Sequence, residues 1–167
     1  MMKKQLKISV LLLVQNFSTS MQNSQILALA ADHAGYKLKE SVKQWLEEAG
    51  YRTVDFGTHD DQSIDYPDVI HPFATAFDEG RFLQGIVICG SGIGVSMVAN
   101  KHQSIRCALC YTPELAGLAR QHNDANVLAM GARFVTVDQA IDILKVFLET
   151  PFEGGRHQLR VEKIALK

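Results

Sequence analysis

The strongest indication of the fold of this 167-residue chain comes from one segment, Ile88-Cys89-Gly90-Ser91-Gly92-Ile93-Gly94. It follows a short apolar run and precedes a segment of helical period, which predicts a buried strand that turns directly into a helix. Alternate glycines at such a turn either let backbone amides approach an anion closely or serve only a tight turn. The spacing does not fit G-x-G-x-x-G, because Val95 follows Gly94, and a dinucleotide site is therefore disfavoured.

Short apolar runs alternate with helical segments on both sides of this turn. The expected strands are 26–31, 52–56, 85–89, 106–110 and 127–130, and the expected helices are 36–49, 68–79, 93–100, 113–122, 137–148 and one from about 156. The alternation predicts an α/β fold, a Rossmann-like, doubly wound, five-stranded parallel sheet with helices on both faces. Ligands of such folds bind beyond the carboxyl ends of the strands.

Composition narrows the possible partners and the compartment. Hydrophobic residues make up 47% of the chain and charged residues 21%, which is enough for a packed core. A net charge of -1 gives no general attraction to nucleic acid or to an anionic membrane, so neither is expected as a partner. Three cysteines form an odd set that argues against a disulfide framework and for the reducing cytoplasm.

Two of these cysteines form a C-x-x-C pattern on an expected strand. Cys107 and Cys110 are three residues apart, and on a strand such residues point to opposite faces. We therefore predict that both belong to the core and that they form neither a redox pair nor half of a zinc site.

The first 24 residues are expected to lie outside the domain, which we place at 25–167. They contain Lys3, Lys4 and Lys7 without an acidic residue, and the apolar run 8–14 is far too short for a membrane-spanning helix. Met21 stands just before the first expected strand. We interpret 1–24 as a disordered extension or a mis-assigned start, with a weak signal-like segment as the alternative.

Two strand ends carry candidate reactive groups. Cys89 precedes a helix start, whose partial positive charge favours a thiolate, although an inert buried cysteine is the alternative. The first strand ends in Asp32 and His33, again before a helix. Asp32 could serve only as a helix N-cap, whereas His33 could donate to a phosphate or transfer a proton.

The helix at 113–122 ends in a dense polar cluster. A polar helix terminus explains Arg120 and Asp124, because cations near this end are mildly favourable. His122 and Asn123 form a better acid/base and hydrogen-bonding pair than a loop requires. Function and a plain polar loop remain equally open from the residues alone.

Arginines near the carboxyl terminus suggest an anion site. Arg156 and Arg160 are four residues apart, a spacing that places both guanidinium groups on one helix face and favours a phosphate between them. Arg133 is a third candidate. The alternative is a solvated basic face with Glu153 and Glu162 as partners. Together with the thiol and the glycines, these residues suggest proton transfer on a small phosphorylated substrate, without need of a metal cluster.

The chain resembles the sugar-phosphate isomerase family that contains ribose-5-phosphate isomerase B and the galactose-6-phosphate isomerase subunits. The resemblance covers roughly 25–165. The motifs that carry it are Asp32-His33-Ala34-Gly35, Asp65-Tyr66-Pro67, 89–94, Asn100-Lys101, 120–128 and Gly154-Gly155-Arg156-His157. It implies a Rossmann-like subunit, a homodimer or homotetramer with sites at the subunit interface, a phosphorylated sugar as substrate, and neither a metal nor another cofactor.

The resemblance also implies roles for the reacting groups. Cys89 would move a proton between C2 and C1 through a cis-enediol, and Ser91 would assist at the sugar oxygens. The amides of Gly90, Gly92 and Gly94 would hold the enediolate charge.

The remaining roles implied by the resemblance concern ring opening and the phosphate. His122 would open the furanose ring, assisted by Asp32 and Asn123, with Tyr66 near the ring. The phosphate ligands would be His33, Arg133, Arg156 and Arg160, some of them from the partner subunit.

These roles lead to one functional hypothesis and two alternatives. The first is an aldose-ketose isomerase that interconverts ribose 5-phosphate and ribulose 5-phosphate in the pentose phosphate pathway. One alternative is the same reaction on a six-carbon sugar phosphate, such as allose or galactose 6-phosphate. The other is a non-catalytic module that binds a sugar phosphate.

Overall fold

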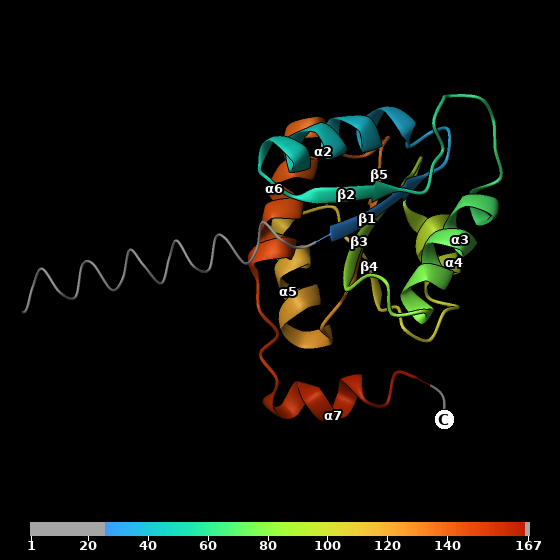
Figure 1. Ribbon diagram of the computed structural model, residues 1–167. Coiled ribbons are helices and arrows are strands. Elements are labelled where there is room, and N and C mark those ends of the chain that lie inside the picture. The colour runs from blue at the N-terminus through green and yellow to red at the C-terminus, as the bar shows by residue number, and fades with distance from the viewer. Residues whose placement is uncertain (1–25, 166–167) are drawn as a thin grey trace, which may run out of the picture.

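Five parallel strands form a single sheet in the computed structural model, which describes residues 26–165 (Figure 1). The expected extension at 1–24 lies outside these residues. The strands are β1 Ile26–Ala31, β2 Arg52–Asp55, β3 Gln84–Cys89, β4 Cys107–Leu109 and β5 Val127–Gly131. Their order across the sheet is β2-β1-β3-β5-β4. The predicted doubly wound sheet is confirmed.

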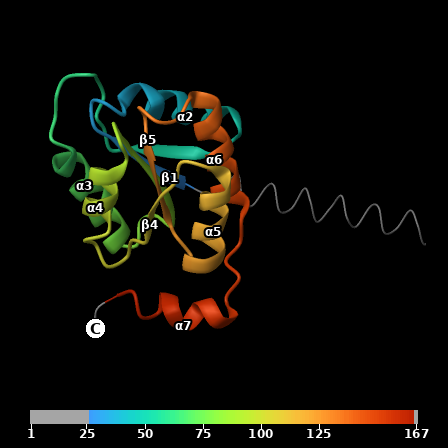
Figure 2. The same ribbon diagram turned by 180° about the vertical axis from the view of Figure 1, so that it is seen from behind.

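Helices cover both faces of the sheet (Figures 1 and 2). They are α2 Tyr36–Glu48, α3 Tyr66–Asp78, α4 Ile93–Ala99, α5 Pro113–Asn123, α6 Val137–Glu149, the 3-10 turn η1 Gly155–His157 and α7 Gln158–Val161. None of the described helices is both long enough and apolar enough to cross a membrane.

Side chains that alternate along the strands divide the interior into two layers. One layer joins strand residues such as Leu29 and Ile88 to α2, α5 and α6. The other joins Val87 and Cys89 to α3 and α4. Cys107 packs against this second layer and Cys110 is buried in the first, so the prediction that they face opposite sides as core residues is confirmed.

The sheet order fixes where a ligand can reach the strand ends. From β1 the chain crosses to β2 on one side, whereas β3 is followed by β4 and β5 on the other. The loops that leave β1 and β3 therefore diverge, and the general rule for such sheets places the ligand crevice between their carboxyl ends. Asp32 and Cys89 stand at these two ends.

One lysine is buried in the interior, which no pattern in the sequence predicted. Lys39, in the first turns of α2, is fully buried, and its ammonium group contacts the carboxylate of Asp55 at the end of β2. The same group donates to Glu40 Oε1 at 2.9 Å. Lys43 Nζ lies 3.8 Å from the Asp55 carboxylate. This ion pair fastens α2 to the edge strand β2.

We expect the substitution Lys39→Ala to lower the free energy of unfolding by about 3 kcal/mol, because it leaves the Asp55 carboxylate buried with a poorer partner. Urea denaturation measures the loss. Lys37→Ala, at an exposed position of the same helix, is the matched control and should change stability little. Equal stability of the two variants would contradict a structural role for the pair.

Candidate active site

The turn after β3 holds the thiol of Cys89 in place. Gly92 precedes α4 with a φ of 75°, a conformation that favours glycine. A Cβ on this glycine would lie 2.8 Å from the carbonyl carbon of Met130, so the turn packs directly against β5. In this geometry the Gly92 N–H donates to Cys89 Sγ at 3.0 Å. A donor aimed at sulfur stabilises the thiolate form.

Cys89 lies deep in the turn. The sequence left open whether Cys89 is reactive or buried, and the structure exposes only 5% of the residue, which packs with the layer that contains α3 and α4. It therefore forms the floor of the turn. Ser91 lies above it, half-buried, and its Oγ accepts a hydrogen bond from Ile93 N at 3.3 Å.

The loop after β1 is tied to the end of β3. The Asp32 N–H donates to Ile88 O at 3.2 Å, and the buried Asp32 carboxylate accepts from Gly35 N at 2.9 Å. Asp32 is thus not the N-cap that the sequence allowed, because Gly35 occupies that position and α2 begins at Tyr36. The carboxylate instead shapes the turn that carries His33.

His33 and Tyr66 bring the loop before α3 over the same strand ends. His33 Nδ1 lies 3.3 Å from both the backbone oxygen and the backbone nitrogen of Ile64. Tyr66 starts α3, and a Cβ on Gly94 would lie 2.9 Å from its ring. The absence of a side chain at Gly94 therefore makes room for the tyrosine.

The guanidinium group of Arg133 covers Gly90 in the same way. Arg133 follows β5, and a Cβ on Gly90 would lie 3.1 Å from its Cζ. The Arg133 N–H also donates to Gly90 O at 3.0 Å. Gly90 and Gly94 thus leave room for the side chains of Arg133 and Tyr66, in addition to the role that the sequence suggested for their amides.

Nine of the predicted site residues therefore meet at the carboxyl edge of the sheet. We call them the carboxyl-edge cluster: Asp32, His33, Tyr66, Cys89, Gly90, Ser91, Gly92, Gly94 and Arg133. They combine a thiol, a hydroxyl, a carboxylate, an imidazole and a guanidinium group around one crevice.

The other predicted residues lie at the opposite edge. His122 and Asn123 end α5, and the chain then enters β5 at Val127, so they stand at the amino ends of the strands. Figures 1 and 2 both place α7 beneath this end and away from the start of α3. Strands of five or six residues, at about 3.3 Å per residue, separate the two edges by about 15 to 20 Å.

We call this second group the amino-edge cluster: His122, Asn123, Glu153, Arg156, His157 and Arg160. The rings of His122 and His157 stack with their centroids 4.3 Å apart. Burial, with the positive charges of His122 and Arg156, lowers the pKa of His157. Glu153 and His157 were not among the predicted site residues, and Glu153 contacts the histidines rather than the arginines.

The two arginines of this cluster do not lie on one continuous α-helix, as their spacing had predicted. Gly154 and Gly155 both have positive φ, and the chain forms a 3-10 turn that contains Arg156 before α7 carries Arg160. The Arg160 side chain nevertheless reaches back, and its Nη1 donates to Arg156 O at 3.4 Å. Both side chains are exposed.

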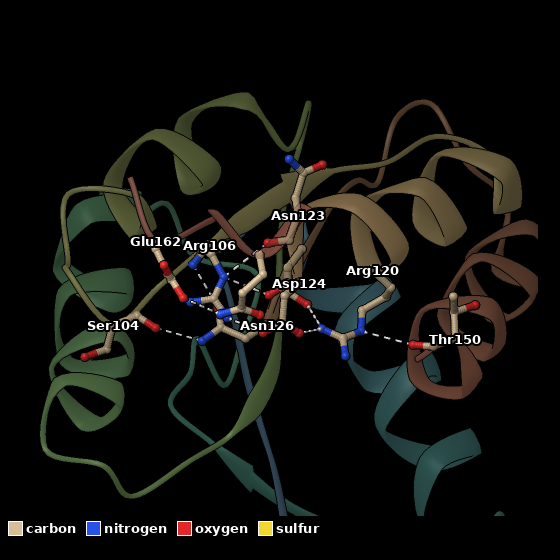
Figure 3. A network of polar contacts seen from close by, with 10 residues as sticks. Ser104, Arg106, Arg120, Asn123, Asp124, Asn126, Thr150 and Glu162 are labelled. Atoms are coloured by element: carbon tan, nitrogen blue, oxygen red, sulfur yellow. Dashed lines mark hydrogen bonds and ion pairs between the residues drawn. The ribbon is translucent and has the colours of Figure 1, made fainter. Parts of the chain in front are cut away.

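Ion pairs fix the end of α5 (Figure 3). Asp124 accepts from Arg120 Nη1 at 2.8 Å and from Arg106 Nη2 at 2.9 Å. Arg120 also donates to Ala125 O. The structural interpretation of Arg120 and Asp124 is therefore confirmed. The Asn123 side chain points away from this network in Figure 3, while its backbone oxygen accepts from Arg106 Nε at 3.2 Å. The network holds the residues of the helix end where a ligand can reach them.

Comparison with known proteins gives one consistent result. The family model described as Ribose/Galactose Isomerase matches residues 27–164. The chain belongs to the ribose/galactose isomerase family. Among its relatives, ribose-5-phosphate isomerase B of Escherichia coli is 44% identical over 138 residues, which cover 83% of this chain and 93% of the relative. The resemblance read from the motifs is confirmed.

Solved structures of family members match the fold as well. Ribose-5-phosphate isomerase B of Clostridium thermocellum is 46% identical, with a TM-score of 0.82 over 84% of this chain and 95% of that one. The structure of the Mycoplasma genitalium ribose-5-phosphate isomerase B contains bound ribulose-5-phosphate and is 41% identical, with a TM-score of 0.79 over 84% of this chain and 94% of that one.

Proposed function

We propose that this chain interconverts ribose 5-phosphate and ribulose 5-phosphate. The observation that carries the proposal is Cys89 Sγ, which is held by the Gly92 amide at the floor of the crevice between β1 and β3. The family's relatives named ribose-5-phosphate isomerase B, one of them with bound ribulose-5-phosphate, support this substrate. The cytoplasmic location and the place in the pentose phosphate pathway stay predictions.

Proton transfer is the task of the carboxyl-edge cluster. The thiolate of Cys89 removes the proton from C2 of the open-chain aldose and returns it to C1, so the cis-enediol becomes the ketose. Ser91 assists the accompanying proton shift between the two sugar oxygens. The amides of Gly90 and Gly94 stabilise the enediolate, a contribution that is often the largest in such reactions, whereas the Gly92 amide donates to Cys89 Sγ.

Ring opening and phosphate binding involve both clusters. His122 acts on the ring oxygen, with Asn123 and Asp32 as hydrogen-bonding partners and Tyr66 against the sugar. The phosphate is bound by a set of cationic side chains: His33, Arg133, Arg156 and Arg160. Because the phosphate is remote from the reacting carbons, its binding energy orients them.

A second subunit completes this site in our proposal. The edges of one chain are too far apart for a five-carbon sugar phosphate to touch both clusters. In a two-fold dimer, the amino-edge cluster of one subunit faces the carboxyl-edge cluster of the other. Three exposed apolar side chains next to the carboxyl-edge cluster, Ile93, Met97 and Phe134, are suited to such an interface.

An isomerase assay tests the function. The purified protein should convert ribose 5-phosphate faster than allose 6-phosphate or galactose 6-phosphate. Preference for a six-carbon substrate would support the first alternative. Binding of both classes without turnover would support the non-catalytic module and contradict the proposal.

The substitution His122→Ala should reduce turnover of ribose 5-phosphate, which is mainly cyclic, more than turnover of a substrate that is permanently open-chain. The physical reason is that only the cyclic substrate needs a proton at its ring oxygen before the isomerisation. Parallel kcat/KM measurements on the two substrates give the ratio. Equal losses on both would contradict a ring-opening role for His122.

A further inference from the structure

Two histidines and a glutamate of the amino-edge cluster present three ligand atoms to one point. His122 Nε2 lies 4.0 Å and His157 Nε2 lies 3.7 Å from the same oxygen of Glu153. All three ligand atoms are within 4.8 Å of one another. The cluster joins the end of α5 to the segment that leads into η1.

These separations are close to those of a transition-metal site. Zinc binds histidine nitrogen at about 2.0–2.1 Å and carboxylate oxygen at about 2.0–2.2 Å, so tetrahedral ligand atoms lie about 3.4 Å apart. The observed distances of 4.0 Å and 3.7 Å exceed this value by about 0.6 Å and 0.3 Å for the two pairs that include Glu153. Small side-chain rotations bring the ligands onto one ion, because the Glu153 side chain is 51% exposed.

The donor set also has the right chemistry. Two imidazoles and one carboxylate bind zinc in open sites that keep a fourth position for water. The neutral form of an imidazole is the one that ligates, and Arg156 Nε donates to His157 Nε2 at 3.3 Å, which marks this nitrogen as an acceptor. Metal binding must displace that donor, and the exposed Arg156 side chain has room to turn away.

We propose that His122, Glu153 and His157 form a binding site for Zn²⁺ or a similar divalent transition-metal ion, and that the bound ion inhibits the enzyme. The ion takes His122 Nε2, the nitrogen that a ring-opening histidine needs free for the proton. It also places a positive charge beside Arg156. The proposed metal binding does not depend on isomerase activity, whereas the proposed inhibition rests on the isomerase function proposed above.

Metal binding is tested first, by isothermal titration of the metal-free protein with Zn²⁺ at about pH 7.5, where imidazoles are mostly neutral. We expect one Zn²⁺ ion to bind per chain, with an affinity that depends on Glu153. The substitution Glu153→Gln should weaken it by about tenfold or more, because even changes behind a metal ligand cost 10- to 100-fold. Glu162→Gln, at the residue that follows α7 and outside the three-ligand set, is the matched control.

This comparison also distinguishes Zn²⁺ binding at this site from Zn²⁺ binding at other thiol or imidazole groups. Zn²⁺ bound to Cys89, or between His71 Nδ1 and His102 Nε2, which lie 3.0 Å apart, would bind equally well to the wild-type protein and to Glu153→Gln. Equal affinity of these two proteins overturns the proposal. The result stands even if the chain has no isomerase activity.

Inhibition is tested on the isomerase assay. Zn²⁺ should inhibit the wild-type protein and the Glu162→Gln variant, and a chelator should restore their activity. Glu153→Gln should need about tenfold more Zn²⁺ for half-inhibition, measured relative to its own rate without Zn²⁺. If Zn²⁺ binding depends on Glu153 but has no effect on turnover, the inhibitory role is overturned. If a chelator without added Zn²⁺ lowers the activity, the ion is not an inhibitor.

Discussion

The substitution Cys89→Ala should lower kcat for ribose 5-phosphate by about 10²- to 10⁴-fold, the usual contribution of a positioned acid or base. In the proposed mechanism the variant lacks the group that carries the proton between C2 and C1, while the proposed amides and phosphate ligands remain. The KM should therefore change little, since the loss falls on the chemical step. Steady-state kinetics measure both constants, and full activity would refute the assignment of Cys89 as the base.

The other two cysteines provide controls within the same chain. Burial, together with the neighbouring Cys110 thiol, raises the pKa of Cys107, and burial raises the pKa of Cys110 to about 11. Both thiols are therefore protonated at neutral pH and unreactive. Cys110→Ala should keep full activity with a melting temperature close to that of Cys89→Ala, which excludes a general loss of fold.

Alkylation distinguishes an enzyme from a binding module. Iodoacetamide should modify Cys89 in preference to the other two cysteines, because the Gly92 N–H donates to its sulfur and burial keeps the other two thiols protonated. Bound substrate should protect Cys89, since the substrate covers the floor of the crevice. Mass spectrometry of peptides locates the modification. An inert Cys89 that stays unmodified without substrate would favour the non-catalytic alternative.

The sequence predicted the fold well because local patterns and tertiary packing agree. The expected ranges of β1 and α2 match the observed ones to within one residue at each end. Burial on both faces made β1 and β5 uninterrupted apolar runs, and Gly50, with a positive φ, follows the end of α2. The burial of Lys39 escaped notice because only the fold brings Asp55 to its ammonium group.

The site was predicted less completely, and the reason is topological. The sequence correctly placed Cys89 and Asp32 at strand ends, whereas His122 was assigned to the same site only by the family resemblance. A signal was available, because a helix that follows one parallel strand returns to the opposite edge before the next strand begins. His122 at the end of α5 therefore had to lie at the amino edge. The alternative interpretation of the sequence paired Glu153 with the arginines, because sequence spacing does not reveal the stacked histidines that it contacts.

The separation of the two clusters leads to the largest qualitative prediction. Cys89→Ala and His122→Ala should each be nearly inactive as pure proteins on cyclic substrate, yet active when both chains are co-expressed in equal amounts. In a mixed dimer, the intact Cys89 of one subunit meets the intact His122 of the other at one of the two sites. Random pairing makes about half of the dimers mixed, so about one quarter of wild-type activity should return.

The control for this experiment uses two changes within one cluster. Co-expression of Cys89→Ala with Ser91→Ala should restore nothing, because every site then contains one damaged carboxyl-edge cluster. Differently tagged chains allow the mixed dimers to be purified, and their activity should be about half that of the wild-type dimer. If mixed dimers of Cys89→Ala and His122→Ala stay inactive, the clusters do not act across the interface. The separation of 15 to 20 Å within one chain would then leave His122 without a part in the reaction, because a bound sugar phosphate is too short to span it.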